Sequence, residues 1–138
     1  MPKPETPLLT VDSIIVFKPN KIVLIRRKNP PFKGEYALPG GFVDIGETVE
    51  NACIREAKEE TNINIKITKL VGVFSKPNRD PRGHVVTIAY LCKPKTKNEK
   101  PQAKDDAQDL DIVDLDEIDS LKLAFDHKEI IKKAKELL

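Results

Sequence analysis

Three glutamates lie close together at positions 56, 59 and 60, in the segment REAKEE. At about 3.6 residues per turn, Glu56, Glu59 and Glu60 would project within roughly a 100° arc of one helix. Carboxylates held so close repel one another unless a cation lies among them. Hard oxygen ligands on a rigid element suit Mg²⁺ or Mn²⁺, and Mg²⁺ is usually shared with substrate phosphates. The spacing therefore indicates metal-assisted attack of water on a phosphoanhydride.

A glycine pair, Gly40 and Gly41, precedes this predicted helix, and Glu47 and Arg55 lie between the glycines and the glutamates. A double glycine lets the backbone come close to a metal or a phosphate. We expect Arg55 to pair with Glu47 and hold the loop against the helix; direct metal binding by Glu47 is the alternative. An acidic helix by itself would usually be a solvated face, but the glycines and Arg55 favour a metal site.

From Gly41 to Ile63 the sequence resembles the Nudix box, G-x5-E-x7-R-E-U-x-E-E-x-G-U, where U is a bulky apolar residue. The positions that differ are Ala57, which is smaller than the usual aliphatic residue, and Asn62, which replaces the closing glycine. Asparagine is the next-best residue in the left-handed conformation that ends a helix. The matching positions are Gly41, Glu47, Arg55, Glu56, Glu59, Glu60 and Ile63.

The resemblance implies an α/β Nudix fold, an α/β/α sandwich with a central mixed β-sheet, in a single Nudix hydrolase domain over residues 1–138. It also implies a cofactor, Mg²⁺ or alternatively Mn²⁺, held by Glu56, Glu60 and the backbone carbonyl of Gly40. Glu59 is either a further metal ligand or the base that deprotonates the attacking water. The predicted catalytic residues are Glu47, Arg55, Glu56, Glu59, Glu60 and Asp106.

The segment SKPNRDPRGH, residues 75–84, is the most informative about the substrate. Its simplest interpretation is a proline-stiffened connection between strands. It also resembles the loop of ADP-ribose pyrophosphatases, in which a proline lies about this far past the box, and both Pro77 and Pro81 fall near that position. Arg79 and Arg82 are then expected to bind a phosphate or a ribose, because arginine favours bidentate contacts. Arg27, in the basic segment 26–35, is a further candidate.

Asp106, with Asp105 and Asp109 as alternatives, is the acidic residue that the resemblance brings toward the metals or the attacking water. His127 lies in a segment that resembles the start of the last helix of the same subgroup, and we expect a structural role for it. Phe32 and Tyr36 are candidates for stacking on a base, although burial in the core is the expected place of Tyr36.

Hydrophobic patterns predict strands over residues 8–17, 22–25, 63–74, 85–93 and 110–115, with a short extended piece over 36–39. The first two strands should form a hairpin, and residues 93–104 an exposed loop. A helix is expected to start at Thr48, which would cap it. Asp126 is expected to cap a last helix together with Glu129. The predicted buried stripe of that helix is Ile130, Ile131, Ala134, Leu137 and Leu138.

The chain has 138 residues, with 24 Lys and Arg against 22 Asp and Glu. Its length suits one domain, and its balanced charge gives no reason to expect nucleic-acid or membrane binding. Cys53 and Cys92 lack metal-type spacing, which indicates buried thiols in a reduced cytoplasmic protein. The resemblance makes a homodimer plausible. No secretion signal or membrane-spanning run is evident.

These observations predict a Mg²⁺-dependent Nudix hydrolase that cleaves a nucleoside diphosphate derivative, with ADP-ribose giving AMP and ribose 5-phosphate. Another Nudix activity, on oxidised nucleoside triphosphates or dinucleoside polyphosphates, is the nearest alternative. A regulatory module that binds a nucleotide without cleaving it is an alternative of another class. The intact acidic positions of the box favour hydrolysis over such a sensor.

Overall fold

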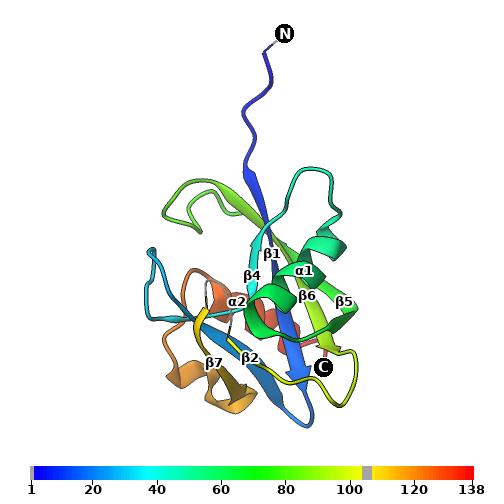
Figure 1. The fold of residues 1–138 in the computed structure, drawn as a ribbon. Helices are drawn as coiled ribbons and strands as arrows, with labels where there is room; N and C mark the ends of the chain where they lie inside the picture. The colour runs from blue at the N-terminus through cyan, green and yellow to red at the C-terminus, as the bar shows by residue number, and fades with distance from the viewer. Residues whose placement is uncertain (1, 104–106) are drawn as a thin grey trace.

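The computed structural model describes residues 2–103 and 107–138. The described residues form strands, two α-helices and a 3-10 helix, which Figure 1 shows in their spatial arrangement. In chain order the elements are β1 (Leu8–Phe17), β2 (Lys21–Arg27), β3 (Tyr36–Ala37), β4 (Gly40–Phe42), α1 (Val49–Thr61), β5 (Ile65–Phe74), β6 (Val85–Pro94), β7 (Ala107–Asp114), η1 (Leu115–Ser120) and α2 (His127–Lys135).

The strands form a mixed sheet in which β1 is the central element. The main strand order is β3-β2-β1-β6-β5, with β4 paired to β1 and β7 paired to β2. Strand β1 runs parallel to β6 and antiparallel to both β2 and β4. The end of β1 pairs with β2, which confirms the predicted hairpin, whereas Thr10–Asp12 pair with Gly40–Phe42. This second pairing places the glycine pair beside the first half of β1.

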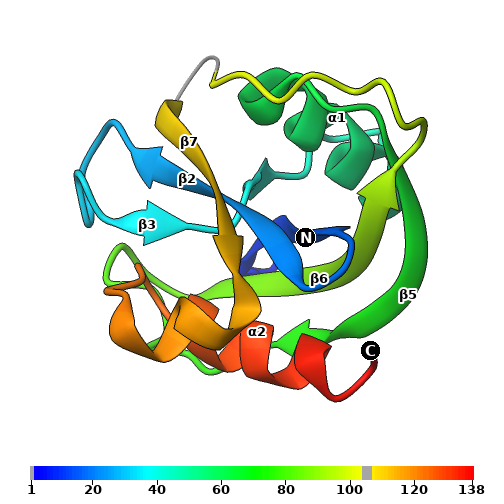
Figure 2. The same ribbon diagram turned by 90° about the horizontal axis from the view of Figure 1, so that it is seen from below.

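The helices α1 and α2 lie on opposite faces of the sheet, as Figure 2 shows. Alternate residues of β1 point to opposite faces, so the strand contributes to both cores. Ile14 packs in the same cluster as Ile130 and Ile131 of α2, whereas Val11 and Ile15 pack in the cluster that contains α1. The predicted α/β/α sandwich with a mixed sheet is therefore confirmed.

Side-chain and backbone caps define both ends of α1. The hydroxyl of Thr48 accepts a hydrogen bond from the N–H of Asn51 (3.0 Å), which confirms Thr48 as the N-cap. At the other end Asn62 adopts the left-handed conformation (φ 63°), the role predicted for it in place of glycine. These caps fix where the helix begins and ends, and so which face carries its glutamates.

Two predictions about α2 are wrong. Leu138 does not belong to the buried stripe, since α2 ends at Lys135 and the residue is 62% exposed. The side chain of Asp126 makes no capping hydrogen bond, because both carboxylate oxygens accept hydrogen bonds from Arg79 (2.9 and 2.6 Å). Glu129 bonds to Asp126 only through the backbone, N–H to carbonyl (2.9 Å). A tertiary ion pair has replaced the local cap.

Cys53 and Cys92 are buried free thiols, as the sequence indicated.

The segment that follows β6 is held at the end of α1. A carboxylate oxygen of Glu99 accepts from the N–H of Asn64 (2.8 Å), and the N–H of Gln102 donates to the carbonyl of Thr61 (2.7 Å). Because β6 continues to Pro94, this exposed loop begins later than predicted.

Candidate active site

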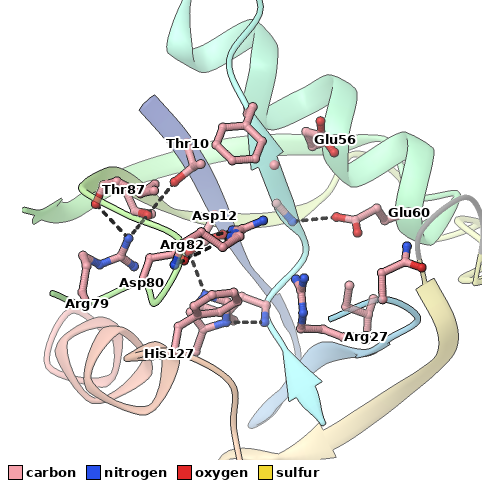
Figure 3. A pocket seen from close by; sticks show the side chains of 18 of the residues that line it. Thr10, Asp12, Arg27, Glu56, Glu60, Arg79, Asp80, Arg82, Thr87 and His127 are labelled. Atoms are coloured by element: carbon pink, nitrogen blue, oxygen red, sulfur yellow. Dashed lines mark hydrogen bonds and ion pairs between the residues drawn. The ribbon is translucent and has the colours of Figure 1, made fainter. Parts of the chain in front are cut away.

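A cavity of about 350 Å³ lies where β1, β4, α1 and the start of α2 meet. Its size falls in the range of small-molecule sites. Figure 3 shows Glu56 and Glu60 projecting from α1 on one side, with Arg79 and Arg82 toward the other. Both signs of charge therefore line the same cavity.

The glycine pair is required for space and not for an unusual backbone conformation, since neither Gly40 nor Gly41 has a positive φ. A Cβ atom on Gly41 would lie 2.5 Å from Cδ and Oε1 of Glu56. A Cβ atom on Gly40 would overlap the carbonyl oxygen of Val11 and Oδ1 of Asp12. The absence of side chains thus lets β4 lie against the Glu56 carboxylate on one face and against β1 on the other.

Arg55 joins the loop after β4 to α1. Its guanidinium makes a bidentate pair with Glu47 (2.6 and 3.1 Å) and also contacts Glu56 (2.8 Å) and Glu59 (3.2 Å). Its hydrogen bonds with Glu47 raise the pKa of Arg55 and lower the pKa of the Glu47 carboxyl. Its Nη2, which also bonds to Glu47, donates to the carbonyl of Phe42 (3.1 Å). The predicted Arg55–Glu47 pair is present, and it ties β4 to the helix.

Glu60 is nearly buried and bonds to the backbone of the glycine pair. Its Oε1 accepts a hydrogen bond from the N–H of Gly40 (2.7 Å). The preceding carbonyl, that of Pro39, accepts a hydrogen bond from the backbone N–H of Ser13 in β1 (2.9 Å). Successive residues of a strand direct their backbone polar groups to opposite sides, so the N–H and the C=O of Gly40 both point away from β1. The carbonyl predicted to bind metal therefore lies on the edge that faces α1.

Glu59 lies outside the cavity lining, and its side chain is 44% exposed. Within residues 2–103 and 107–138, no three His, Cys, Asp or Glu side chains are gathered as a ready-made metal cluster. Arg55 lies among these carboxylates and pairs with Glu47, Glu56 and Glu59. Glu56, Glu60 and the Gly40 carbonyl nevertheless present hard oxygen atoms to one edge of the cavity, a donor set that suits Mg²⁺ or Mn²⁺.

The segment after β5 brings two arginines to the cavity, and they differ in burial and in their ion-pair partners. Arg79 is 4% exposed and is held by Asp126 (2.6 Å) and by the hydroxyl of Thr87 (2.6 Å). Arg82 is half-exposed and makes a bidentate pair with the buried Asp80 (2.8 and 3.1 Å). Both arginines line the cavity, whereas the predicted Pro77 is exposed and does not. Arg82 is the more accessible of the two for a ligand.

An aromatic ring that sequence reasoning did not single out forms part of the cavity wall. Phe125 lies near the guanidinium groups of Arg27 (5.0 Å to the ring centroid) and Arg82 (5.5 Å). Phe32 packs edge-on against it (4.8 Å between centroids). Phe125 has a positive φ of 52°, a strained conformation for a bulky residue that is often found at functional sites. Arg27, for which the sequence predicts ligand binding, also lines the cavity.

Asp12 and His127 meet at the floor of the cavity. The Nδ1 atom of His127 accepts a hydrogen bond from the N–H of Leu38 (3.0 Å), which leaves the ring proton on Nε2. That Nε2 lies 3.2 Å from Oδ2 of Asp12. Both ring nitrogens therefore face protein groups, which agrees with the structural role expected of His127.

The NUDIX domain family profile matches residues 7–134 of this chain. The chain belongs to the NUDIX domain family. The predicted family and the predicted Nudix fold are thereby confirmed.

This Nudix domain is similar to several known proteins in sequence and in structure. An ADP-ribose pyrophosphatase of Methanocaldococcus jannaschii is 52% identical over 126 residues, which cover 91% of this chain and 72% of that protein. The NUDIX domain of Shewanella oneidensis NrtR, solved in complex with ADP ribose, has a TM-score of 0.84 and 30% identity; the match covers 96% of this chain and 89% of that one. A bifunctional NMN adenylyltransferase/ADP ribose pyrophosphatase from Francisella tularensis, solved with AMP and a Mn ion, has a TM-score of 0.85 and 32% identity, and the match covers 96% and 42%.

Some predicted residues of the Nudix site are not gathered at the cavity. Asp105 and Asp106 lie outside the described residues, and Asp109 is exposed on β7, opposite Arg26 of β2. Tyr36 packs against the core and donates a hydrogen bond to Asp111, so it is not a free stacking surface. Phe32 lies behind Phe125 and does not line the cavity.

The structure contains no helix, among the residues described, that is long and apolar enough to cross a membrane.

Proposed function

We propose that this Nudix domain hydrolyses the pyrophosphate of ADP-ribose to AMP and ribose 5-phosphate, with Mg²⁺ as cofactor and Mn²⁺ as a substitute. The observation that carries the proposal is that Glu56 and Glu60 line the same cavity as Arg27 and Arg82. Its oxygen donors suit a divalent ion and its arginines suit phosphate. Similarity to an ADP-ribose pyrophosphatase over most of the chain supports the choice of substrate.

Glu56, Glu60 and the Gly40 carbonyl would hold the metal. When bound, a divalent ion in such a site lowers the pKa of a water ligand and neutralises charge on phosphoryl oxygens. Arg55 acts through other residues: its contacts with Glu47 and Glu56 keep the helix carboxylates and β4 in place. Glu59, or an acidic residue from 105–109, would orient or deprotonate the attacking water.

The basic side of the cavity would receive the substrate. Arg82 and Arg27 flank Phe125 and are placed to contact a phosphate or a ribose. Arg79 contributes mainly by holding the start of α2 through Asp126, because its guanidinium is buried in that pair.

We also propose that residues 1–138 are one domain, which the family match over 7–134 supports. We propose further that the protein forms homodimers in the cytoplasm.

Product chromatography with a panel of substrates tests the proposal. ADP-ribose, NADH, diadenosine tetraphosphate and 8-oxo-dGTP would each be incubated with Mg²⁺ or with EDTA. AMP and ribose 5-phosphate should form fastest from ADP-ribose, and only with the metal. Faster cleavage of a triphosphate or a dinucleotide would keep the metal chemistry and overturn the substrate.

Replacement of a single metal ligand tests the site itself. Glu60→Gln keeps the hydrogen bond to the Gly40 N–H but removes the charge, and should lower kcat/KM by more than about 100-fold. Glu50→Gln is the matched control, because Glu50 is exposed on the first turn of the same helix. Wild-type turnover by Glu60→Gln would remove Glu60 from the mechanism.

Binding of ADP-ribose without turnover is the second candidate function. Similarity to the NrtR domain, which was solved with ADP ribose, is the observation that favours it. Calorimetric binding of ADP-ribose by a wild-type protein that cleaves no member of the panel would establish this alternative.

A further inference from the structure

The cavity continues past β4 to the opposite face of the sheet. Gly41 faces α1, since a Cβ there would meet Glu56, whereas Gly40 faces Asp12. Both glycines and both carboxylates line the same cavity. Asp12, Thr87, Arg82, Phe125 and His127 line another part of this same cavity, which we call the Asp12 chamber.

Asp12 has unused capacity to accept hydrogen bonds. The residue is 6% exposed, and no described residue donates a hydrogen bond to its Oδ2. The Nε2 of His127 is close (3.2 Å) but lies outside hydrogen-bond geometry. A buried carboxylate oxygen without a hydrogen bond is costly, so a ligand that donates to Oδ2 gains more than it would at an exposed carboxylate. Nothing in the metal chemistry proposed above uses this group.

The chemistry of a carboxylate selects the kind of ligand group. An ionised carboxylate only accepts hydrogen bonds, and its two oxygens match two neighbouring hydroxyl donors. Dinucleotide-binding folds use an acidic residue for ribose hydroxyls in this way. An adenine amino group fits less well, because the ring nitrogen beside it is an acceptor that a carboxylate repels.

The position of Asp12 agrees with a ribose. Asp12 is paired with Gly40 across β1 and β4, and the N–H of Gly40 bonds to Glu60. Opposed residues of this type of pair lie about 4.5 Å apart at Cα, so the Asp12 chamber begins next to the metal and pyrophosphate end. A ribose is the group attached directly to a pyrophosphate, whereas a base lies one unit further away.

We propose that the Asp12 chamber binds the vicinal hydroxyls of a ribose attached to the pyrophosphate, and that Asp12 determines specificity for this diol. The proposal rests on the proposed function in one respect, that the pyrophosphate lies at Glu56 and Glu60. ADP-ribose contains two such riboses, that of adenosine and the terminal one, and the same chemistry applies to both.

Equilibrium binding with matched ligands tests the proposal. Isothermal titration in EDTA would compare ADP-ribose with the analogues that lack the 2′-hydroxyl on the adenosine ribose or on the terminal ribose. The proteins are the wild type, Asp12→Asn, Asp12→Glu and the control Asp119→Asn, an exposed residue of η1 outside the cavity. Asp12→Glu keeps the charge and moves it, and so serves if Asp12→Asn does not fold.

One of the two analogues should bind the wild type and Asp119→Asn at least about tenfold more weakly than ADP-ribose does. The position of the missing hydroxyl in that analogue identifies the ribose that the Asp12 chamber binds. In either Asp12 variant this difference should fall below about threefold, an effect that a merely structural role of Asp12 would not produce. Equal affinity of the wild type for all three ligands, or undiminished discrimination in a folded Asp12 variant, would overturn the proposal.

Hydrolysis measured in parallel with Mg²⁺ separates the two proposals. Cleavage of ADP-ribose without hydroxyl discrimination would overturn only the role of Asp12. Discrimination without cleavage of ADP-ribose would overturn only the proposed activity. Absence of ADP-ribose binding and cleavage would overturn both.

Discussion

Replacing Gly41 with alanine would place a methyl group 2.5 Å from Cδ and Oε1 of Glu56, and 2.7 Å from its Oε2. Ordinary van der Waals contact begins at 3.4 Å, so the carboxylate must retreat by about 0.9 Å. Glu56 can do this by rotating its side chain, which leaves the backbone in place. We therefore expect the variant to fold with a loss of stability below about 1 kcal/mol. A displacement of this size at a reacting centre costs about 100-fold in rate.

Gly40→Ala is the matched comparison, one residue away on the opposite face. Its methyl group would overlap the carbonyl oxygen of Val11 and Oδ1 of Asp12. The Val11 carbonyl belongs to the backbone of the central strand and cannot rotate away. We expect a loss of about 1–3 kcal/mol, which for a domain of this size lowers Tm by roughly 3–4 °C per kcal/mol.

Thermal melts and kcat/KM for Mg²⁺-dependent ADP-ribose hydrolysis, measured on the same preparations, test the pair. Gly41→Ala should lose activity while keeping a Tm close to wild type, and Gly40→Ala should melt markedly earlier. Wild-type kcat/KM in Gly41→Ala would refute the argument that this space serves the Glu56 carboxylate. A larger Tm loss in Gly41→Ala than in Gly40→Ala would refute the assignment of the two glycines to opposite faces.

Three further substitutions test the parts that hold the site. Asn62→Ala puts a residue with a Cβ atom but no polar side chain at φ 63°, and should cost about 1 kcal/mol in urea unfolding, while Asn62→Gly should stay near wild type. Burial alone would raise the pKa of Asp80, but the hydrogen bonds from Arg82 outweigh it and hold that pKa below its usual value. These hydrogen bonds stabilise the folded protein at pH values above the pKa of Asp80 in the unfolded chain, and the stabilisation is lost as the pH falls through the lower pKa of Asp80 in the folded protein. The difference in Tm between wild type and Arg82→Gln should therefore be largest near neutral pH and shrink below about pH 4. An equal difference in Tm at both pH values would contradict this. Arg79→Met leaves Asp126 without its buried partner and should cost about 3–5 kcal/mol by thermal or urea unfolding, of which adding Asp126→Asn should restore a part.

The box helix shows how far local sequence rules reach. Thr48 and Asn62 were predicted as its start and end, and Arg55 as the partner of Glu47, and the structure contains all three features. Each depends on groups a few residues apart on one helix and its adjoining loop. Capping and short-range ion pairs act at this distance whatever the rest of the fold does.

Asp126 shows where the same rules fail. A capping residue with Glu129 after it is a sound local pattern, but Arg79 approaches from another segment and takes both carboxylate oxygens. A buried charge needs an opposite charge more than a helix end needs a cap, because caps can be replaced by backbone bonds. The 3-10 helix η1 was not predicted either.

The family, the order of the main elements and the acidic face of α1 can all be predicted from the sequence, because periodicity, caps and motif spacing encode them. The cavity that Asp12, Phe125 and Arg82 share with Glu56 and Glu60 is evident only in the folded chain. Pairing of β1 with β4 brings Asp12 to the glycine pair, and packing of the segment before α2 brings Phe125 to the arginines. Such contacts join residues far apart along the chain, so no local sequence pattern predicts them. They form only when the strands have paired and the helices cover the faces of the sheet.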